Sequence, residues 1–278
     1  GPNVVGVYGL LQSGDTFTDY RQLARESNAS ANFAAEMMDT RMAVKNYVIS
    51  KNPDTVERVR AARQTLIADI ETKRSLFDDP ETLAIVDEIA AKVQAYEAAF
   101  EEAVGHHARR DELVINTLDK LGPSLRENVT DIMESAYADD DASSAYDAGR
   151  TQERFLLARL YATKFLVSNE RGDYERAMEE FAKVDDLAAS MLAELQNPAR
   201  RELAQEFIDG VAVYAATLTR VSDAITARNA AITGKLDVIG PEVRQTLVER
   251  AGPVASCRLA LRAAQLVARC DVDADEVT

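Results

Sequence analysis

Two arginines of this chain, Arg41 and Arg159, stand on stretches that are apolar at helical spacing. Their neighbours three and four positions away are Met37, Met38, Val44 and Lys45 for the first, and Phe155, Leu156, Ala162 and Thr163 for the second. An arginine that faces a core needs an anionic partner, because desolvating an unpaired guanidinium is prohibitive. A carboxylate would satisfy it through a two-point contact. Both arginines are therefore candidates for binding a small organic acid.

An internal ion pair is the alternative for each arginine. Asp119 and Asp237 fall near the same height on the predicted helices, so either carboxylate would neutralise a neighbouring guanidinium. Three residues just after two Gly-Pro pairs, Arg126, Arg244 and Thr246, are secondary candidates for ligand contacts. Solvated surface positions are the alternative for these three, and the sequence leaves both interpretations open.

Other polar residues give weaker indications. Tyr96 and Tyr214 would reach a small ligand, but buried tyrosines in helical bundles are typically packing residues. Di-iron bundles need a Glu-x-x-His motif, with a spacing of three residues, on two helices. Here Glu102 lies four residues before His106, and His106 and His107 are the only histidines of the chain. No phosphate-binding loop, dinucleotide glycine pattern or nucleophile elbow occurs. We therefore expect no enzymatic activity, no cofactor and no metal.

The sequence matches itself at an offset of 118 residues, the difference between positions 159 and 41. At this offset Arg41–Ser50 lies over Arg159–Ser168, and Leu118–Pro123 lies over Leu236–Pro241, without a gap. A constant offset over such a span is typical of two copies of one structural unit. The positions of the candidate residues therefore follow from the architecture of a single copy.

Few helix breakers interrupt the chain, and they fall at matching places in the two copies. They predict an all-α protein of six helices, with a polar run at 138–144 between the copies. The expected helices cover roughly residues 14–50, 55–77, 81–138, 144–169, 173–196 and 199–254. The third and sixth would each be roughly 80–87 Å long at 1.5 Å per residue, about twice the others. Each long helix therefore matches two short ones placed end to end.

This matching of lengths predicts two stacked four-helix bundles. Helices 1 and 4 with the lower halves of 3 and 6 would form a membrane-proximal module. Helices 2 and 5 with the upper halves would form a membrane-distal module. Both arginines and both Gly-Pro pairs would then lie at one level of the lower bundle, where the prolines kink the long helices and open its interior.

The composition excludes several classes of partner. The net charge of −15 argues against binding to nucleic acid or to anionic membrane surfaces. Cys257 and Cys270 are neither a disulfide framework nor a zinc pattern. Residues 1–11 are apolar in part and are expected to be the remnant of a transmembrane flank or a tag. The helical ligand-binding domain would cover residues 12–255, and 256–278 is an atypical tail, vector-derived or natural.

The pattern resembles the helical bimodular sensor domain of bacterial methyl-accepting chemotaxis receptors and sensor histidine kinases. The resemblance covers roughly residues 12–254 and depends on the six-helix repeat, on Leu118–Pro123 with Leu236–Pro241, and on the arginine segments at 41–47 and 159–165. It implies a periplasmic domain flanked by two transmembrane helices that senses small molecules such as dicarboxylates and acetate. In one branch the domain docks a periplasmic binding protein. The tail at 256–278 departs from this pattern.

These observations together predict the extracytoplasmic sensor domain of a bacterial chemoreceptor. We expect it to bind a small carboxylate between Arg41 and Arg159, to form a homodimer, and to signal by helix displacements of roughly 1–2 Å. The alternatives are a sensor-kinase input domain that binds a periplasmic partner protein, and a structural helical spacer.

Overall fold

The computed structural model describes the backbone of residues 4–250, and describes side chains from residue 21 onward together with that of Thr18. These residues form helices, and no strand occurs among them. The predicted all-α class is therefore confirmed for the described part of the chain. The tail expected at 256–278 lies outside the described residues, and residues 4–11 belong to the first helix.

The helical runs follow the predicted order, and most of their ends lie within a few residues of the prediction. Their bounds are α1 Val4–Ser50, α2 Pro53–Lys73, the 3₁₀ turn η1 Arg74–Leu76, α3 Pro80–Leu113, the π turn η2 Val114–Leu118, α4 Asp119–Ala138, α5 Ala142–Ser168, α6 Arg171–Glu194, α7 Pro198–Ala231 and the π turn η3 Ile232–Leu236. Residues 237–250 continue as α-helix after η3. The two long predicted helices therefore each contain one π turn.

Both π turns lie next to the Gly-Pro pairs. Each ends five residues before a proline: η2 ends at Leu118 before Pro123, and η3 ends at Leu236 before Pro241. A π turn holds one extra residue between hydrogen-bonded peptide groups, and such turns often occur at functional sites. Each predicted long helix therefore has a π turn five residues before its proline, which the sequence pattern did not indicate, and the proline kink stays a prediction.

The chain divides into two compact units. Unit 1 comprises residues 4–102 and 230–250 of the described chain, and unit 2 comprises residues 103–229. Helix α1 thus belongs with α2, and α5 belongs with α6. The predicted modules, which paired helix 1 with helix 4 and helix 2 with helix 5, are wrong in this respect.

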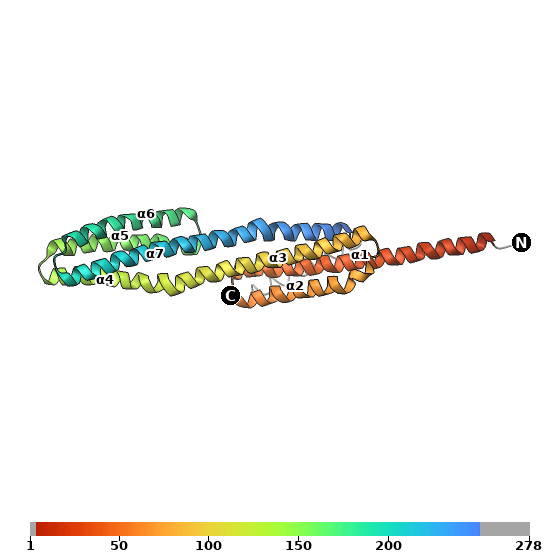
Figure 1. Ribbon diagram of the computed structural model, residues 1–278, viewed down its shortest axis with the longest axis horizontal. Helices are drawn as coiled ribbons and strands as arrows, with labels where there is room; N and C mark the ends of the chain where they lie inside the picture. The colour runs from red at the N-terminus through yellow and green to blue at the C-terminus, as the bar shows by residue number, and fades with distance from the viewer. Residues whose placement is uncertain (1–3, 251–278) are drawn as a thin grey trace, which may run out of the picture. The chain divides into compact units, whose positions relative to one another are not determined.

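The reason is the turn that follows α1 and α5. Lys51 and Asn169 adopt the left-handed conformation, with φ of 54° and 57°. Their backbone N–H groups donate to Tyr47 O at 2.7 Å and to Phe165 O at 2.8 Å. A left-handed residue at this position ends a helix and changes the direction of the chain. As a result, α2 packs along α1 and α6 packs along α5, instead of continuing beyond them (Figure 1).

Unit 2 encloses a core to which four helical segments contribute. Phe155 of α5 meets Phe207 of α7 edge to face at 5.3 Å, and Phe181 of α6 meets Tyr214 at the same centroid distance. Val129 of α4 is completely buried in the same cluster. Aromatic pairs of this kind add about 0.5–1.5 kcal/mol each to the hydrophobic contribution of their burial. The core therefore holds α4, α5, α6 and α7 together.

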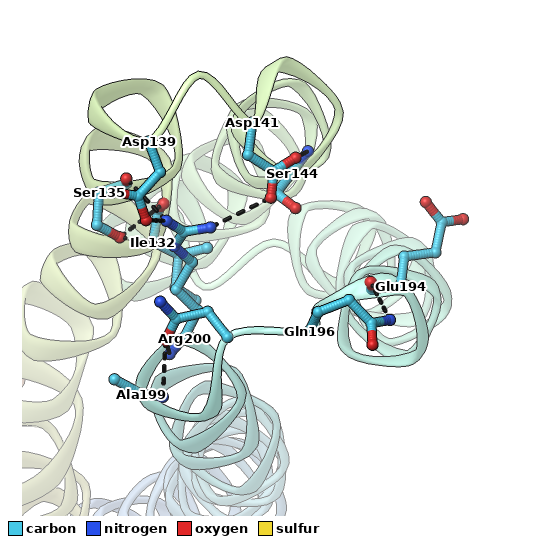
Figure 2. Close-up of polar contacts among 10 residues, drawn as sticks. Ile132, Ser135, Asp139, Asp141, Ser144, Glu194, Gln196, Ala199 and Arg200 are labelled. Carbon is cyan, nitrogen blue, oxygen red and sulfur yellow. Dashed lines mark hydrogen bonds and ion pairs between the residues drawn. The ribbon is translucent and has the colours of Figure 1, made fainter.

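A buried arginine ties α7 to the turn between α4 and α5 (Figure 2). Arg200 is 4% exposed. Its Nη2 donates to Ser135 O at 2.9 Å, and its Nε donates to Ser135 Oγ at 3.1 Å. The same guanidinium pairs with Asp139 and, at 3.2 Å, with Asp141. Because Ser135 is in the last turn of α4, Arg200 satisfies a helix-end carbonyl and two of the three acidic side chains of the turn.

Unit 1 has its own core. Tyr47 of α1 packs edge to face on Phe100 of α3, with 5.2 Å between the ring centroids. The ring centroid of Phe33 lies 6.4 Å from that of Phe77, which follows η1. Leu66 of α2 is fully buried. The apolar faces of α1, α2 and α3 therefore form the frame on which Arg41 is presented.

Candidate functional site

Arg41 lies against a glycine of the helix at 237–250, in unit 1. A methyl group built on Gly240 would come within 2.9 Å of Arg41 Nε and 3.0 Å of Tyr96 Cε2. The first distance is shorter than real Cβ contacts and the second is tight, so with a side chain at this position Arg41 would have to shift and Tyr96 would have to give way slightly. Gly240 therefore positions two of the candidate side chains by leaving room for them.

Tyr96 of α3 is 3% exposed and places its hydroxyl near both charges of the site. Burial raises its pKa to about 12; the charge of Arg41 opposes this rise and that of Asp237 adds to it. The phenol is thus neutral at physiological pH and keeps its proton for donation to an acceptor. Arg41, Tyr96 and Asp237 therefore converge on one place.

That place is a cavity of about 300 Å³, which we call the Arg41 cavity. Its polar lining consists of Arg41, Lys45, Tyr96 and Asp237. The volume is at the lower end of the range for small-molecule sites in proteins. The cavity is therefore suited to a compound of a few heavy atoms rather than to a large cofactor.

The charged side chains that line the cavity form no ion pairs within the described part of the protein. The structure has no ion pair between Arg41 and Asp237, and none between Lys45 and Asp237. The alternative of an internal Arg41–Asp237 pair is therefore wrong. Two cationic groups and one carboxylate face the same space, and a guanidinium in such a position is suited to bind an anionic group.

The rest of the lining is aliphatic and comes from two elements. One side is a single face of α1, since its lining residues follow Arg41 at intervals of three, four, seven and eight. The other is the π turn η3 with the residue after it. The aliphatic members are Val44, Val48 and Ile49 of α1, with Ile232 and Leu236 of η3. The cavity is thus walled by the irregular turn that precedes Gly240.

Unit 2 holds a matching arrangement with a different outcome. A methyl group on Gly122 would come within 2.8 Å of Arg159 Nε, close to the 2.9 Å of the equivalent pair in unit 1. Here, however, the guanidinium lies over the Phe155 ring, 5.8 Å from its centroid. It also donates a hydrogen bond to Tyr214, whose pKa is raised by burial and partly lowered again by Arg159. Arg159 is therefore held by aromatic neighbours, and it has no ion pair with Asp119.

The expectation that Arg41 and Arg159 clamp one anion together is wrong. The two residues belong to different compact units, and each packs against the glycine of its own unit. The same turns at Lys51 and Asn169 that fold α2 and α6 back explain this separation. The structure therefore assigns each arginine to a site of its own.

The secondary candidates do not line the Arg41 cavity. Arg126 belongs to unit 2 and lies 3.6 Å from Glu127, with 43% of its side chain exposed. Arg244 is exposed, and the hydroxyl of Thr246 donates to the carbonyl of Glu242 at 3.1 Å. Surface positions and helix backbone contacts account for these three residues.

Sequence reasoning missed the role of Lys45 and of the η3 residues Ile232 and Leu236. The signal for Lys45 was present, because residues at positions 41, 44, 45, 48 and 49 share one helical face. Nothing in the local pattern distinguishes a π turn from ordinary helix, so the second wall was not predictable in the same way.

Neither of the two comparisons with known proteins identifies a relative. No family model matches the chain, and no curated protein matches it. Within residues 4–250, no helix is both long enough and apolar enough to cross a membrane. The same part of the chain contains no group of three His, Cys, Asp or Glu side chains arranged to hold a metal ion. Function is therefore inferred from the geometry of the Arg41 cavity.

Proposed function

We propose that this chain is the extracytoplasmic sensor domain of a bacterial chemoreceptor, and that it binds a small organic acid in the Arg41 cavity. The observation that carries the proposal is a guanidinium that faces a cavity of about 300 Å³ without an ion-pair partner in the described protein. A carboxylate would form charge-assisted hydrogen bonds with it. Tyr96, which keeps its proton at physiological pH, would donate a further hydrogen bond.

The proposal includes two stacked four-helix bundles that arose by internal duplication. Matching local contacts support the duplication. Thr82 N donates to Asp79 Oδ2 at 2.8 Å and, 118 positions later, Arg200 N donates to Asn197 Oδ1 at 3.4 Å. The π turns η2 and η3 also begin 118 residues apart, at Val114 and Ile232. In this proposal unit 1, which holds the Arg41 cavity, is the membrane-proximal module.

Signalling would begin at the π turn. A ligand in the Arg41 cavity would contact α1 and η3 together, and η3 leads directly into the helix at 237–250. Since a π turn holds one extra residue, a change to α-helical bonding would move the following helix by about one residue, roughly 1.5 Å. Displacements of this size are sufficient to switch helical interfaces. The parent protein would be anchored in the inner membrane and would work as a homodimer, with the domain in the periplasm.

A thermal-shift screen with small carboxylates, amines and sugars tests the proposal. A ligand that binds only the folded state adds about 2.7 kcal/mol of stability at a hundredfold excess over its Kd. We expect carboxylates to raise Tm in the wild type and in Arg159→Ala, but not in Arg41→Ala. Arg159→Ala is the matched control, because it removes the equivalent arginine of the other unit.

Two results would contradict the proposal. The first is that no carboxylate shifts Tm. The second is a shift that persists in Arg41→Ala when circular dichroism shows that this variant is folded. In the first case an input domain of a sensor histidine kinase, which binds a periplasmic partner protein, becomes the better candidate.

A further inference from the structure

The charges of the Arg41 cavity have two signs, and this restricts the ligand further. Arg41 and Lys45 lie four residues apart on one face of α1, whereas Asp237 comes from the residue that follows η3. The cationic and anionic groups therefore reach the cavity from different elements. They are not ion-paired with each other, so each charge remains available to a ligand group of opposite charge.

The remaining wall of the cavity is apolar. Val44 and Leu236 are 4% and 3% exposed, and with Val48 and Ile232 they form an aliphatic surface beside the charges. Because Val44 and Leu236 are already almost out of water, the gain of about 25 cal/mol for each Å² of apolar area removed from water would come from the half-buried Val48 and Ile232 and from the hydrocarbon surface of the ligand itself. A short branched hydrocarbon chain would use this gain, whereas a second charged group would lose it.

We infer that the Arg41 cavity binds an aliphatic α-amino acid in its zwitterionic form. The carboxylate would bind Arg41 and accept a hydrogen bond from Tyr96, the ammonium group would bind Asp237, and the side chain would lie against the aliphatic wall. This inference rests on the proposed function, because it uses the same carboxylate contact. It adds the ammonium group and the aliphatic chain to the description of the ligand.

Other small ligands fit the cavity less well. A dicarboxylate would bring its second charge toward Asp237 or the aliphatic wall, which raises the desolvation cost. Lys45 and Asp237 are both exposed, so water screens the attraction of one and the repulsion of the other for the second carboxylate, and the aliphatic wall is what disfavours that group. An aliphatic amine would pair with Asp237 but would leave the guanidinium of Arg41 facing an apolar group.

Isothermal titration calorimetry with four related compounds tests the inference. L-Leucine carries both charges, 4-methylpentanoate lacks the ammonium group, 3-methylbutan-1-amine lacks the carboxylate, and succinate has two carboxylates. We expect leucine to bind about tenfold more tightly than 4-methylpentanoate, and both to bind more tightly than the amine or succinate. The Asp237→Asn variant should remove the advantage of leucine, so that leucine and 4-methylpentanoate bind to it with equal affinity.

The outcomes separate this inference from the proposed function. If 4-methylpentanoate binds in an Arg41-dependent manner but leucine binds no more tightly, the amino-acid inference is wrong and the proposed carboxylate site stands. Tighter binding of succinate than of leucine overturns the inference in the same way. If none of the three carboxylates binds, both are wrong. Leucine binding that is insensitive to Asp237→Asn also overturns the inference, because the ammonium contact is then absent.

Discussion

Units 1 and 2 place the same three residue types at equivalent positions and use them differently. In both, an arginine packs against a glycine next to a buried tyrosine. In unit 2 the ring of Phe155 lies beneath Arg159, while the equivalent position in unit 1 is Met37. The face of an aromatic ring stabilises a guanidinium by about 0.5–2 kcal/mol through the quadrupole of the ring. Methionine has no ring and does not provide this stabilisation. The arginine of unit 2 is thus bound by the protein, and that of unit 1 is available to a ligand.

The units also differ in how firmly polar contacts tie their helices. Unit 2 has Arg200 at the α4–α5 turn, where the equivalent residue of unit 1 is Thr82. It also contains Glu180, which is fully buried and lies within 3.0 Å of Arg176 and 2.8 Å of Lys183. The equivalent of Glu180 in unit 1 is Ala62. Unit 2 therefore holds the buried polar networks, whereas unit 1 carries the cavity and ties α2 to α3 through the more exposed Arg60–Glu101 and Arg63–Glu97 pairs.

The largest expected effect is on the stability of unit 2. Arg200→Ala removes a buried side chain and its charged hydrogen bonds and leaves a helix-end carbonyl without its donor, so we expect a loss of about 3 kcal/mol. The measurement is denaturant unfolding, with hydrogen exchange at residues 135–141 to show that the loss is local. The matched control is Thr82→Ala, at the equivalent position of unit 1, with an expected effect of less than about 1 kcal/mol. Equal losses in the two variants would mean that the units are not stabilised differently.

The next effect is a dependence on alkaline pH in both units. The pKa of Tyr96 is raised on folding from 10.0 to about 12. A raised pKa stabilises the fold below the unfolded-state value, and this contribution disappears as pH rises through the folded-state value. Two pKa units at 1.36 kcal/mol each correspond to about 2.7 kcal/mol of stability, which should be lost between pH 10 and pH 12. The measurement is unfolding of the wild type and of Tyr96→Phe across this range, in which the variant should lose less stability.

Tyr214→Phe sharpens the same comparison. Burial raises the pKa of Tyr214 too, but Arg159 lowers it through its charge and its hydrogen bond. The difference in alkaline sensitivity between wild type and variant should therefore be smaller for Tyr214 than for Tyr96. A larger difference for Tyr214 would show that the aromatic contacts of Arg159 do not distinguish the two sites.

The smallest effect concerns the glycines. Gly240→Ala pushes Arg41 away from its backbone support, and we expect about a tenfold loss of carboxylate affinity, equivalent to about 1.4 kcal/mol. Gly122→Ala produces the same crowding beside Arg159 in unit 2 and should leave carboxylate affinity unchanged. Calorimetric titration of both variants measures this directly. Loss of affinity in Gly122→Ala would place the site in the wrong unit.

Much of the fold was predictable from the sequence, because the residues that begin and end its helices act locally. A proline after an aspartate or an asparagine marks the helix starts at Pro80 and Pro198, where Asp79 and Asn197 accept hydrogen bonds from the first turn. The pairing of helices was not predictable in this way. It depends on Lys51 and Asn169, which are not glycines and yet adopt a left-handed conformation.

The candidate site was predictable in part, for a similar reason. Arg41 stands out by its apolar helical neighbours, which any single helix reveals. Whether such an arginine is free depends on a residue one turn earlier, Met37 or Phe155, and on the π turn that faces it from another helix. The sequence pattern therefore identified both arginines but could not separate the available one from the one held by aromatic rings.

A crystal structure of the chain with 4-methylpentanoate, at a concentration well above its Kd, tests the central claim most directly. The account predicts density for the compound in the Arg41 cavity, with both carboxylate oxygens within about 3.2 Å of the guanidinium and the hydrocarbon chain against Val44 and Leu236. It also predicts that Arg159 stays over Phe155 without ligand. An empty Arg41 cavity, or density for the compound at Arg159 instead, would contradict the claim that unit 1 is the binding unit.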